Sequence, residues 1–154
     1  MKKMMIIIVP SILVLLGVII AFMAYNKVVP IGLGMHKPVF QVNNIAMDGY
    51  DVTSYFENNI KRGKPEFAVT HLGVDWYFSS VDRLSQFKAD PEKYIPQFGG
   101  YCSKAVSTGF TAPADPTIYT IHEKKLYVFS SEEVKENFLL DPSKIIDACE
   151  SKWK

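Results

Sequence analysis

Cys102 is the residue of this 154-residue chain whose type and setting are best suited to chemistry. It follows a Gly-Gly-Tyr tripeptide, and residues 102–109 are predicted to form a helix that begins at the cysteine. The free N–H groups and the positive dipole end of a helix start stabilise a thiolate, and Lys104 adds a positive charge nearby. We therefore expect Cys102 at a helix N-terminus, near the surface of a concavity that Tyr101 helps to line.

The alternative for Cys102 is a structural role. A small apolar thiol beside two glycines also fills a tight space in a core, where it stays inert. A second cysteine, Cys149, is expected near the end of a later helix and away from Cys102, and the sequence leaves open whether the two pair. A lone thiol without a CxxC partner is a poor candidate for a disulfide oxidoreductase.

Two histidines offer a second set of candidate ligands. His71 and His122 occupy equivalent positions in two similar segments, 51 residues apart, so pseudo-twofold symmetry could bring them together as metal ligands alongside Cys102. Neither lies in an HxxxH motif or beside a CxxC motif, which are the spacings typical of metal sites. The other interpretation is that each ring satisfies its nitrogens at a strand end beside a turn.

The two similar segments, residues 71–95 and 122–146, align without a gap and share nine identical residues. Each begins with an aromatic run typical of a half-buried strand, and continues with a serine pair suited to cap a helix. An Asp-Pro pair then ends that helix and starts another. With a partner strand upstream, the repeats span residues 66–95 and 117–146. The sequence thus predicts a small α+β domain of two repeated hairpin-and-helix units. The two units are expected to superpose, with Phe78 on Phe129 and Phe87 on Phe138, and to share one core.

No catalytic motif accompanies these residues. The chain has no Ser-His-Asp order with supporting motifs, no HExxH sequence and no glycine-rich phosphate loop before Lys-Ser or Lys-Thr. Its formal net charge is +1, without a basic cluster, so no nucleic-acid partner is predicted. The pattern favours a protein that is not an enzyme.

The N-terminal segment differs in character from the rest. Residues 4–25 contain no charged residue, and a helix of that length spans about 33 Å, against about 30 Å for a bilayer core. Two lysines precede the run, which favours a cytoplasmic N-terminus. We predict a single-pass membrane anchor over residues 1–25, a linker over 26–44 and an extracytoplasmic (periplasmic) domain over 45–154. A cleaved signal peptide is the alternative.

Much of the predicted domain resembles a known family. The tracts MDGYDVTSYF (47–56), GKPEF (63–67), YFSSVDRLSQFKADPEKY (77–94) and YIPQFGGYCSKAVSTG (94–109) are similar to the YHS domain. The similarity is to the longer form found in secreted or membrane-anchored bacterial proteins, and it covers roughly residues 45–153. It implies a YHS-like fold and a role in handling metals.

The resemblance also limits the chemistry to be expected. The short metal-binding form of the family has cysteines directly after the Tyr-Phe pair and four residues later, where this chain has Ser79 and Arg83. That thiolate site is therefore not expected here. The long form keeps a cysteine in its GGYC tract, which implies a chemical role for Cys102.

Three functions remain open at the level of sequence. The first is a membrane-anchored extracytoplasmic YHS-type module that binds a metal ion or metal-containing ligand, such as copper, zinc or haem, between the repeats. Cys102 would be its soft donor. The second is a thiol redox protein with Cys102 as its reactive centre. The third is a structural interaction domain of a membrane complex, with a protein partner.

Overall fold

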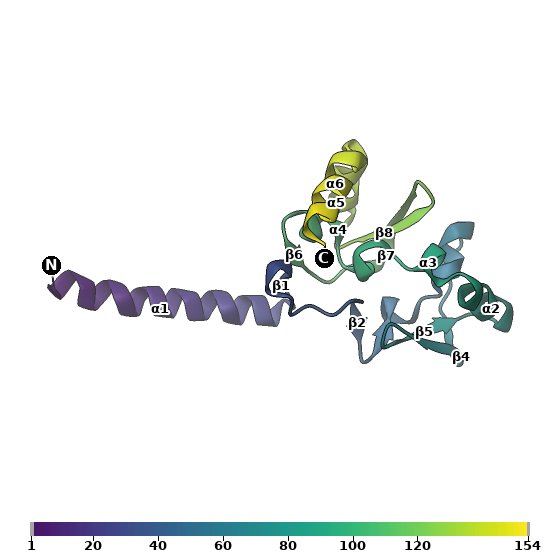
Figure 1. Ribbon diagram of the computed structural model, residues 1–154, viewed down its shortest axis with the longest axis horizontal. Helices are drawn as coiled ribbons and strands as arrows, with labels where there is room; N and C mark the ends of the chain where they lie inside the picture. Colours follow the sequence, from purple (N-terminus) through teal and green to yellow (C-terminus); the bar gives the residue numbers. More distant parts are fainter. Residues whose placement is uncertain (1, 154) are drawn as a thin grey trace.

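The computed structural model describes the backbone of residues 2–153 and the side chains of residues 12–153. Helix α1 (Lys2–Tyr25) extends away from the rest of the chain, and the strands and shorter helices that follow form a small α+β domain (Figure 1). The predicted α+β class is confirmed.

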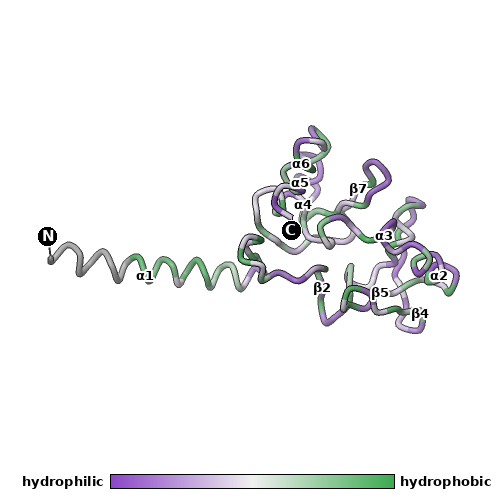
Figure 2. Tube along the Cα trace, viewed as in Figure 1, coloured by the Kyte–Doolittle hydropathy of each residue, from purple (hydrophilic) through white to green (hydrophobic). Residues whose placement is uncertain are grey.

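The membrane anchor predicted for residues 1–25 is not supported. The described side chains of α1, residues 12–25, are apolar and mostly exposed (Figure 2). Within the described part of the chain, no helix is long and apolar enough to cross a membrane, which needs about 20 apolar residues. The side chains of residues 4–11 in the predicted span lie outside the described ones. The predicted transmembrane helix, single-pass topology and periplasmic placement are therefore not supported.

The first unit is built on a β-hairpin. Strands β4 (Lys64–His71) and β5 (Val74–Phe78) pair antiparallel, with a register shift early in β4. Strand β3 (Ile45–Ala46) pairs parallel with β5 and antiparallel with β2 (Gln41–Val42), which completes a four-stranded sheet of order β2-β3-β5-β4. The aromatic run of the sequence thus lies in a central strand of this sheet.

Two capped helices follow the hairpin. The Ser80 side chain accepts a hydrogen bond from the first turn of α2 (Val81–Ala89), and the Asp90 side chain does the same for α3 (Pro91–Tyr94). Each cap satisfies an N–H group that has no partner within its own helix. The serine pair and the Asp-Pro pair therefore act as the sequence predicted.

The second unit repeats this order, and its strands and its first helix have the same bounds shifted by 51 residues. Its hairpin carries a register shift at the equivalent place. Its second helix starts at the equivalent residue but continues much further than α3. The elements are β7 (Asp115–His122), β8 (Lys125–Phe129), α5 (Glu132–Leu140) and α6 (Pro142–Lys152).

The repeat begins further upstream than the sequence predicted. Each unit starts with a short 3-10 turn, η2 (Met47–Gly49) or η4 (Gln97–Gly100), whose last residues have positive φ angles. A helical segment follows each turn, a 3-10 helix η3 (Val52–Glu57) in the first unit and α4 (Ser103–Ser107) in the second. The structural repeat therefore spans residues 47–95 and 98–146.

The segment predicted as a linker is tied to both units. Strand β1 (Val29–Pro30) pairs with β6 (Phe110–Thr111) in the second unit, and the 3-10 helix η1 (Ile31–Leu33) follows it. Ile31 packs in the core of the second unit, whereas Val39 packs in the core of the first. Residues 29–42 therefore bridge the two halves of the domain.

The core consists of two clusters and not the one shared core that we predicted. Phe78 and Phe87 pack in the first cluster with their ring centroids 5.0 Å apart. Their counterparts Phe129 and Phe138 pack in the second cluster, 5.1 Å apart. Each helix thus covers the hairpin of its own unit.

Strand β8 explains why the core divides. Leu126 and Val128 pack in the first cluster, while Tyr127 and Phe129 pack in the second, so both faces of β8 are buried along these four residues. The corresponding residues of β5, Asp75 and Tyr77, stay partly exposed. The second hairpin therefore forms a middle layer between the first unit and α5.

The division of the core predicts separate and similar costs for the two buried phenylalanines. Phe87→Ala and Phe138→Ala should each lower the free energy of unfolding by about 3–5 kcal/mol, because each leaves a cavity among aromatic rings. Leu140→Ala is the matched control, since this leucine is 83% exposed, and should change it by less than about 0.5 kcal/mol. Urea unfolding measures all three. A loss below about 1 kcal/mol for either phenylalanine would contradict the two-cluster packing.

Candidate functional site

The setting of Cys102 is best understood from its counterpart in the first unit, Asp51. The backbone N–H of Asp51 donates to the carbonyl oxygen of Lys61 at 2.9 Å, and that of Cys102 donates to the carbonyl oxygen of Ala112 at 3.1 Å. Donors and acceptors are both 51 residues apart. Each residue is also the N-cap of the helical segment that follows it. The two side chains therefore occupy equivalent positions.

In the first unit, this position holds a closed network of charges and hydrogen bonds. The fully buried Asp51 carboxylate accepts hydrogen bonds from the N–H and hydroxyl of Thr53 and from the N–H and hydroxyl of Ser79, at 2.7–3.0 Å. Arg83 Nε lies 3.8 Å from the same carboxylate, and its guanidinium also pairs with Glu57. Ser79 and Arg83 therefore belong to a structural network of hydrogen bonds and ion pairs.

In the second unit, the equivalent position holds a thiol with fewer hydrogen-bond partners. Cys102 Sγ donates to Ser130 Oγ at 3.4 Å, and Ser130 is the counterpart of Ser79. Val134 replaces Arg83, so this unit lacks the guanidinium. Cys102 is only 3% exposed, which contradicts the expectation of a solvent-accessible thiol. Ser130 is exposed and borders a cavity of about 520 Å³, so the thiol lies directly beneath the surface.

Tyr101 is buried and packs within the second cluster. Its hydroxyl donates to the carbonyl oxygen of Lys37 at 3.2 Å, and its ring lies 5.5 Å from that of Phe40 and 6.0 Å from that of Trp153. Burial raises the pKa of Tyr101, although the hydrogen bond to Lys37 opposes the shift. These contacts hold the segment before the first unit against the second.

Cys149 lies close to the Cys102 segment, contrary to our prediction. Its Sγ donates to the carbonyl oxygen of Ser103 at 3.1 Å, and the two cysteines are free thiols. Burial, and next the charge of Cys102, raises the pKa of Cys149 to about 12. The prediction failed because α6 continues beyond its counterpart α3 and packs along α4. The structure thus brings both cysteines to the first turn of α4.

His71 and His122 each pack against the helix of their own unit. The ring of His71 meets that of Phe87 edge-on at 5.8 Å, and the ring of His122 meets that of Phe138 in the same way at 6.2 Å. His71 Nε2 is buried without a hydrogen-bond partner. Among the described residues, no group of three or more His, Cys, Asp or Glu side chains is arranged to hold a metal ion.

The contacts of Cys102 with Ser130 and of Cys149 with α4 were missed by sequence reasoning. One signal for the first was present, because the Gly-Tyr pair at 49–50 recurs at 100–101 and extends the repeat upstream. This register aligns Cys102 with Asp51. The position of Cys149 had no such signal, because it depends on how α6 packs.

No protein-family model, curated protein or solved structure was found to match this chain. The resemblance to the YHS family therefore stays a prediction.

Removing the charge of Asp51 should destabilise the fold strongly. Asp51→Asn leaves Arg83 without its buried counter-charge and puts an amide N–H group where an acceptor is needed, at a cost of about 3–5 kcal/mol. Asp48→Asn is the matched control, because the ion pair of Asp48 with Arg62 is more than half exposed, and should cost less than about 1 kcal/mol. Urea unfolding compares the two, and similar losses would contradict a structural role for the network.

In the reduced, metal-free protein, Cys149 should be alkylated only when the protein unfolds. With its pKa raised to about 12, the thiol stays protonated and unreactive in the folded state between about pH 8 and 10. Mass spectrometry after iodoacetamide treatment should show that modification of Cys149 tracks the urea unfolding curve. Rapid alkylation in native buffer would instead show an accessible thiolate.

Proposed function

We propose that this chain is a non-catalytic binding module that holds a soft metal ion, with the Cys102 thiolate as a donor and Cys149 as the second. The observation that carries the proposal is the convergence of both free thiols on the first turn of α4. Thiolate ligands select soft ions such as Cu(I), which is stable with only two sulfur donors. Copper is therefore favoured over zinc or haem among the expected ligands.

The difference between the two units supports a metal-binding role for the second unit and not for the first. In the first unit, Arg83 balances the charge of Asp51. Hydrogen bonds occupy the carboxylate oxygens of Asp51, so neither oxygen is free to bind a metal ion. In the second, a thiolate at Cys102 would have no arginine beside it, because Val134 takes that position. A buried anion needs a counter-charge, and a bound cation supplies one.

Access to the thiols would pass Ser130. This residue is exposed, accepts the hydrogen bond from Cys102 and borders a cavity that Phe40 and Pro113 also line. A change in the Ser130 rotamer would open the path to Cys102 Sγ. Metal binding then releases the protons of both thiols, as it does wherever cysteine is the ligand.

The same two thiols favour a redox protein as a second candidate. A partner disulfide would oxidise Cys102 and Cys149 to one disulfide, taking two electrons and two protons and becoming two thiols. This requires both sulfurs to approach within bonding distance. The redox candidate relies on the same proximity of the two thiols to the first turn of α4 but needs no bound ion.

Competition for Cu(I) distinguishes the two candidates. The reduced full-length protein should withdraw one equivalent of Cu(I) from the bicinchoninate complex under anaerobic conditions. Cys102→Ser should abolish this and Cys149→Ser should weaken it at least about tenfold, because one sulfur donor is lost. Ser107→Ala, at the other end of α4, is the matched control and should bind as wild type does.

Other outcomes would replace the metal proposal. If the wild-type protein fails to compete, but glutathione disulfide joins Cys102 to Cys149, the redox candidate is supported. If Cys102→Ser loses its native circular dichroism, the thiol is structural. Unchanged Cu(I) binding in both cysteine variants would place the metal elsewhere.

A further inference from the structure

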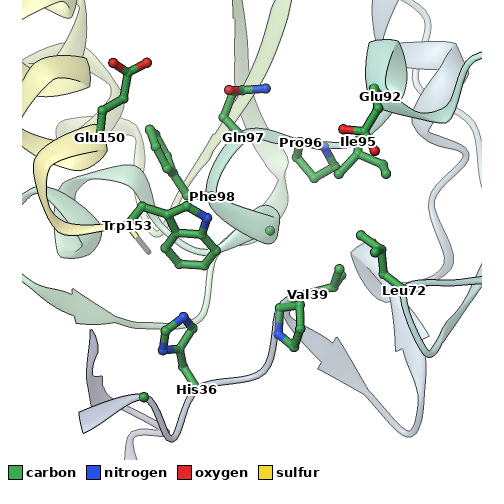
Figure 3. Close-up of a pocket in the computed structure, with 13 residues that line it drawn as sticks. His36, Val39, Leu72, Glu92, Ile95, Pro96, Gln97, Phe98, Glu150 and Trp153 are labelled. Carbon is green, nitrogen blue, oxygen red and sulfur yellow. The ribbon is translucent and has the colours of Figure 1, made fainter. Parts of the chain in front are cut away.

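The boundary between the two units contains a cleft that the thiol site does not use. The cleft has a volume of about 630 Å³, within the range of about 300–1,000 Å³ typical of small-ligand sites. One wall comes from η4 and the C-terminal Trp153, and the other comes from the first unit and the segment before it (Figure 3). Cys102 and Cys149 are not among its lining residues.

Three aromatic rings form one corner of the cleft. The ring of Trp153 lies between those of Phe98 and His36 in Figure 3. Its centroid is 6.0 Å from that of Phe98, at an interplanar angle of 70°, and 5.0 Å from that of His36, at 48°. Rings set at such angles present π-electron density from more than one direction. This arrangement suits a cation that carries no hydrogen-bond donors, such as a quaternary ammonium group.

Two carboxylates add negative charge to the same cleft. Glu92 comes from α3 in the first unit and Glu150 from α6 in the second, so the two approach from different units (Figure 3). Both are exposed, and neither forms an ion pair with a basic side chain of the described residues. Their field therefore attracts a cation to the cleft.

The remaining wall is apolar. Leu72, at the tip of the first hairpin, is 52% exposed and borders the cleft together with Val39, Ile95 and Pro96. Of these side chains, the exposed Leu72 and the half-buried Ile95 offer contact to a hydrocarbon body next to the charged group. The cleft thus combines an aromatic corner, negative charge and an apolar wall.

The cleft is also held in shape by backbone contacts. The Phe40 N–H donates to the carbonyl oxygen of Gly99 at 2.8 Å, and the Trp153 N–H donates to that of Cys149 at 2.8 Å. Gly99 has a φ of 63°, and a Cβ there would collide with the carbonyl oxygen of Pro38. Walls fixed before binding lower the entropic cost of binding a ligand.

We propose that this cleft binds a small organic cation with a quaternary or methylated ammonium group on a short apolar body. The ammonium group would contact Trp153, Phe98 and His36, with Glu92 and Glu150 providing long-range attraction. The apolar body would lie against Leu72 and its neighbours. The proposal is independent of the metal site, because the two share no residue.

Choline is a suitable probe, and 3,3-dimethylbutan-1-ol is its neutral isostere, with carbon in place of nitrogen. Choline chloride should cause a saturable change in the tryptophan fluorescence of the full-length protein. Trp153 reports it, because the other tryptophan, Trp76, is 1% exposed in the first cluster. The alcohol should bind at least about tenfold more weakly, because the cation–π attraction is absent.

Variants at the cleft test the location by calorimetry. Glu150→Gln and Glu92→Gln should each weaken choline binding, and both positions are exposed, so the fold should be unaffected. Trp153→Leu should abolish it. Glu136→Gln on α5 is the matched control, because Glu136 is equally exposed but does not line the cleft, and should leave the affinity unchanged.

Three results would overturn the proposal. Equal affinity for choline and for the alcohol would show that charge plays no part. The absence of a saturable signal with choline would show that the cleft does not bind such cations. Choline binding that survives both Trp153→Leu and the glutamate substitutions would place the site elsewhere.

Discussion

The burial of strand β8 on both of its faces is the constraint on which the rest of the structure depends. A single hairpin with its helix has one apolar face and leaves the other in solvent, as β5 does at Asp75 and Tyr77. In the second unit, Leu126 and Val128 make the outer face apolar as well. That face packs on the first unit, because leaving its apolar side chains in water would forfeit the free energy gained when they are buried. The two units are thereby locked together, and the cleft arises at their boundary.

The two units share a backbone conformation but differ in the side chains at equivalent buried positions. Asp51 and Cys102 occupy the same place in the two units, with equivalent backbone hydrogen bonds. A buried carboxylate requires a counter-charge, and Arg83 supplies it, whereas the equivalent position beside the Cys102 thiol holds the uncharged Val134. The change from Asp51 to Cys102 between the units is therefore accompanied by the change from Arg83 to Val134. At this position the first unit holds a structural ion-pair network, and the second holds a buried thiol.

The two proposed sites depend on different parts of this architecture. The thiol site forms within the second unit, where α6 extends along α4 and brings Cys149 beside Ser103. The cleft forms between the units, and its walls come from four separated stretches of the chain, with Trp153 near the C-terminus. Neither site contains a recognisable catalytic constellation among the described residues.

The sequence by itself determined the local structure of this protein. The aromatic runs, the serine caps and the Asp-Pro pairs specify hairpins and helices, because their hydrogen bonds and backbone preferences involve neighbouring residues. Tertiary structure alone decided that Phe78 and Phe129 belong to different clusters, that Cys102 is buried and that Cys149 lies beside α4. Those outcomes depend on which face of β8 meets which unit and on where α6 packs. Such contacts join residues far apart in the chain, and no local pattern encodes them.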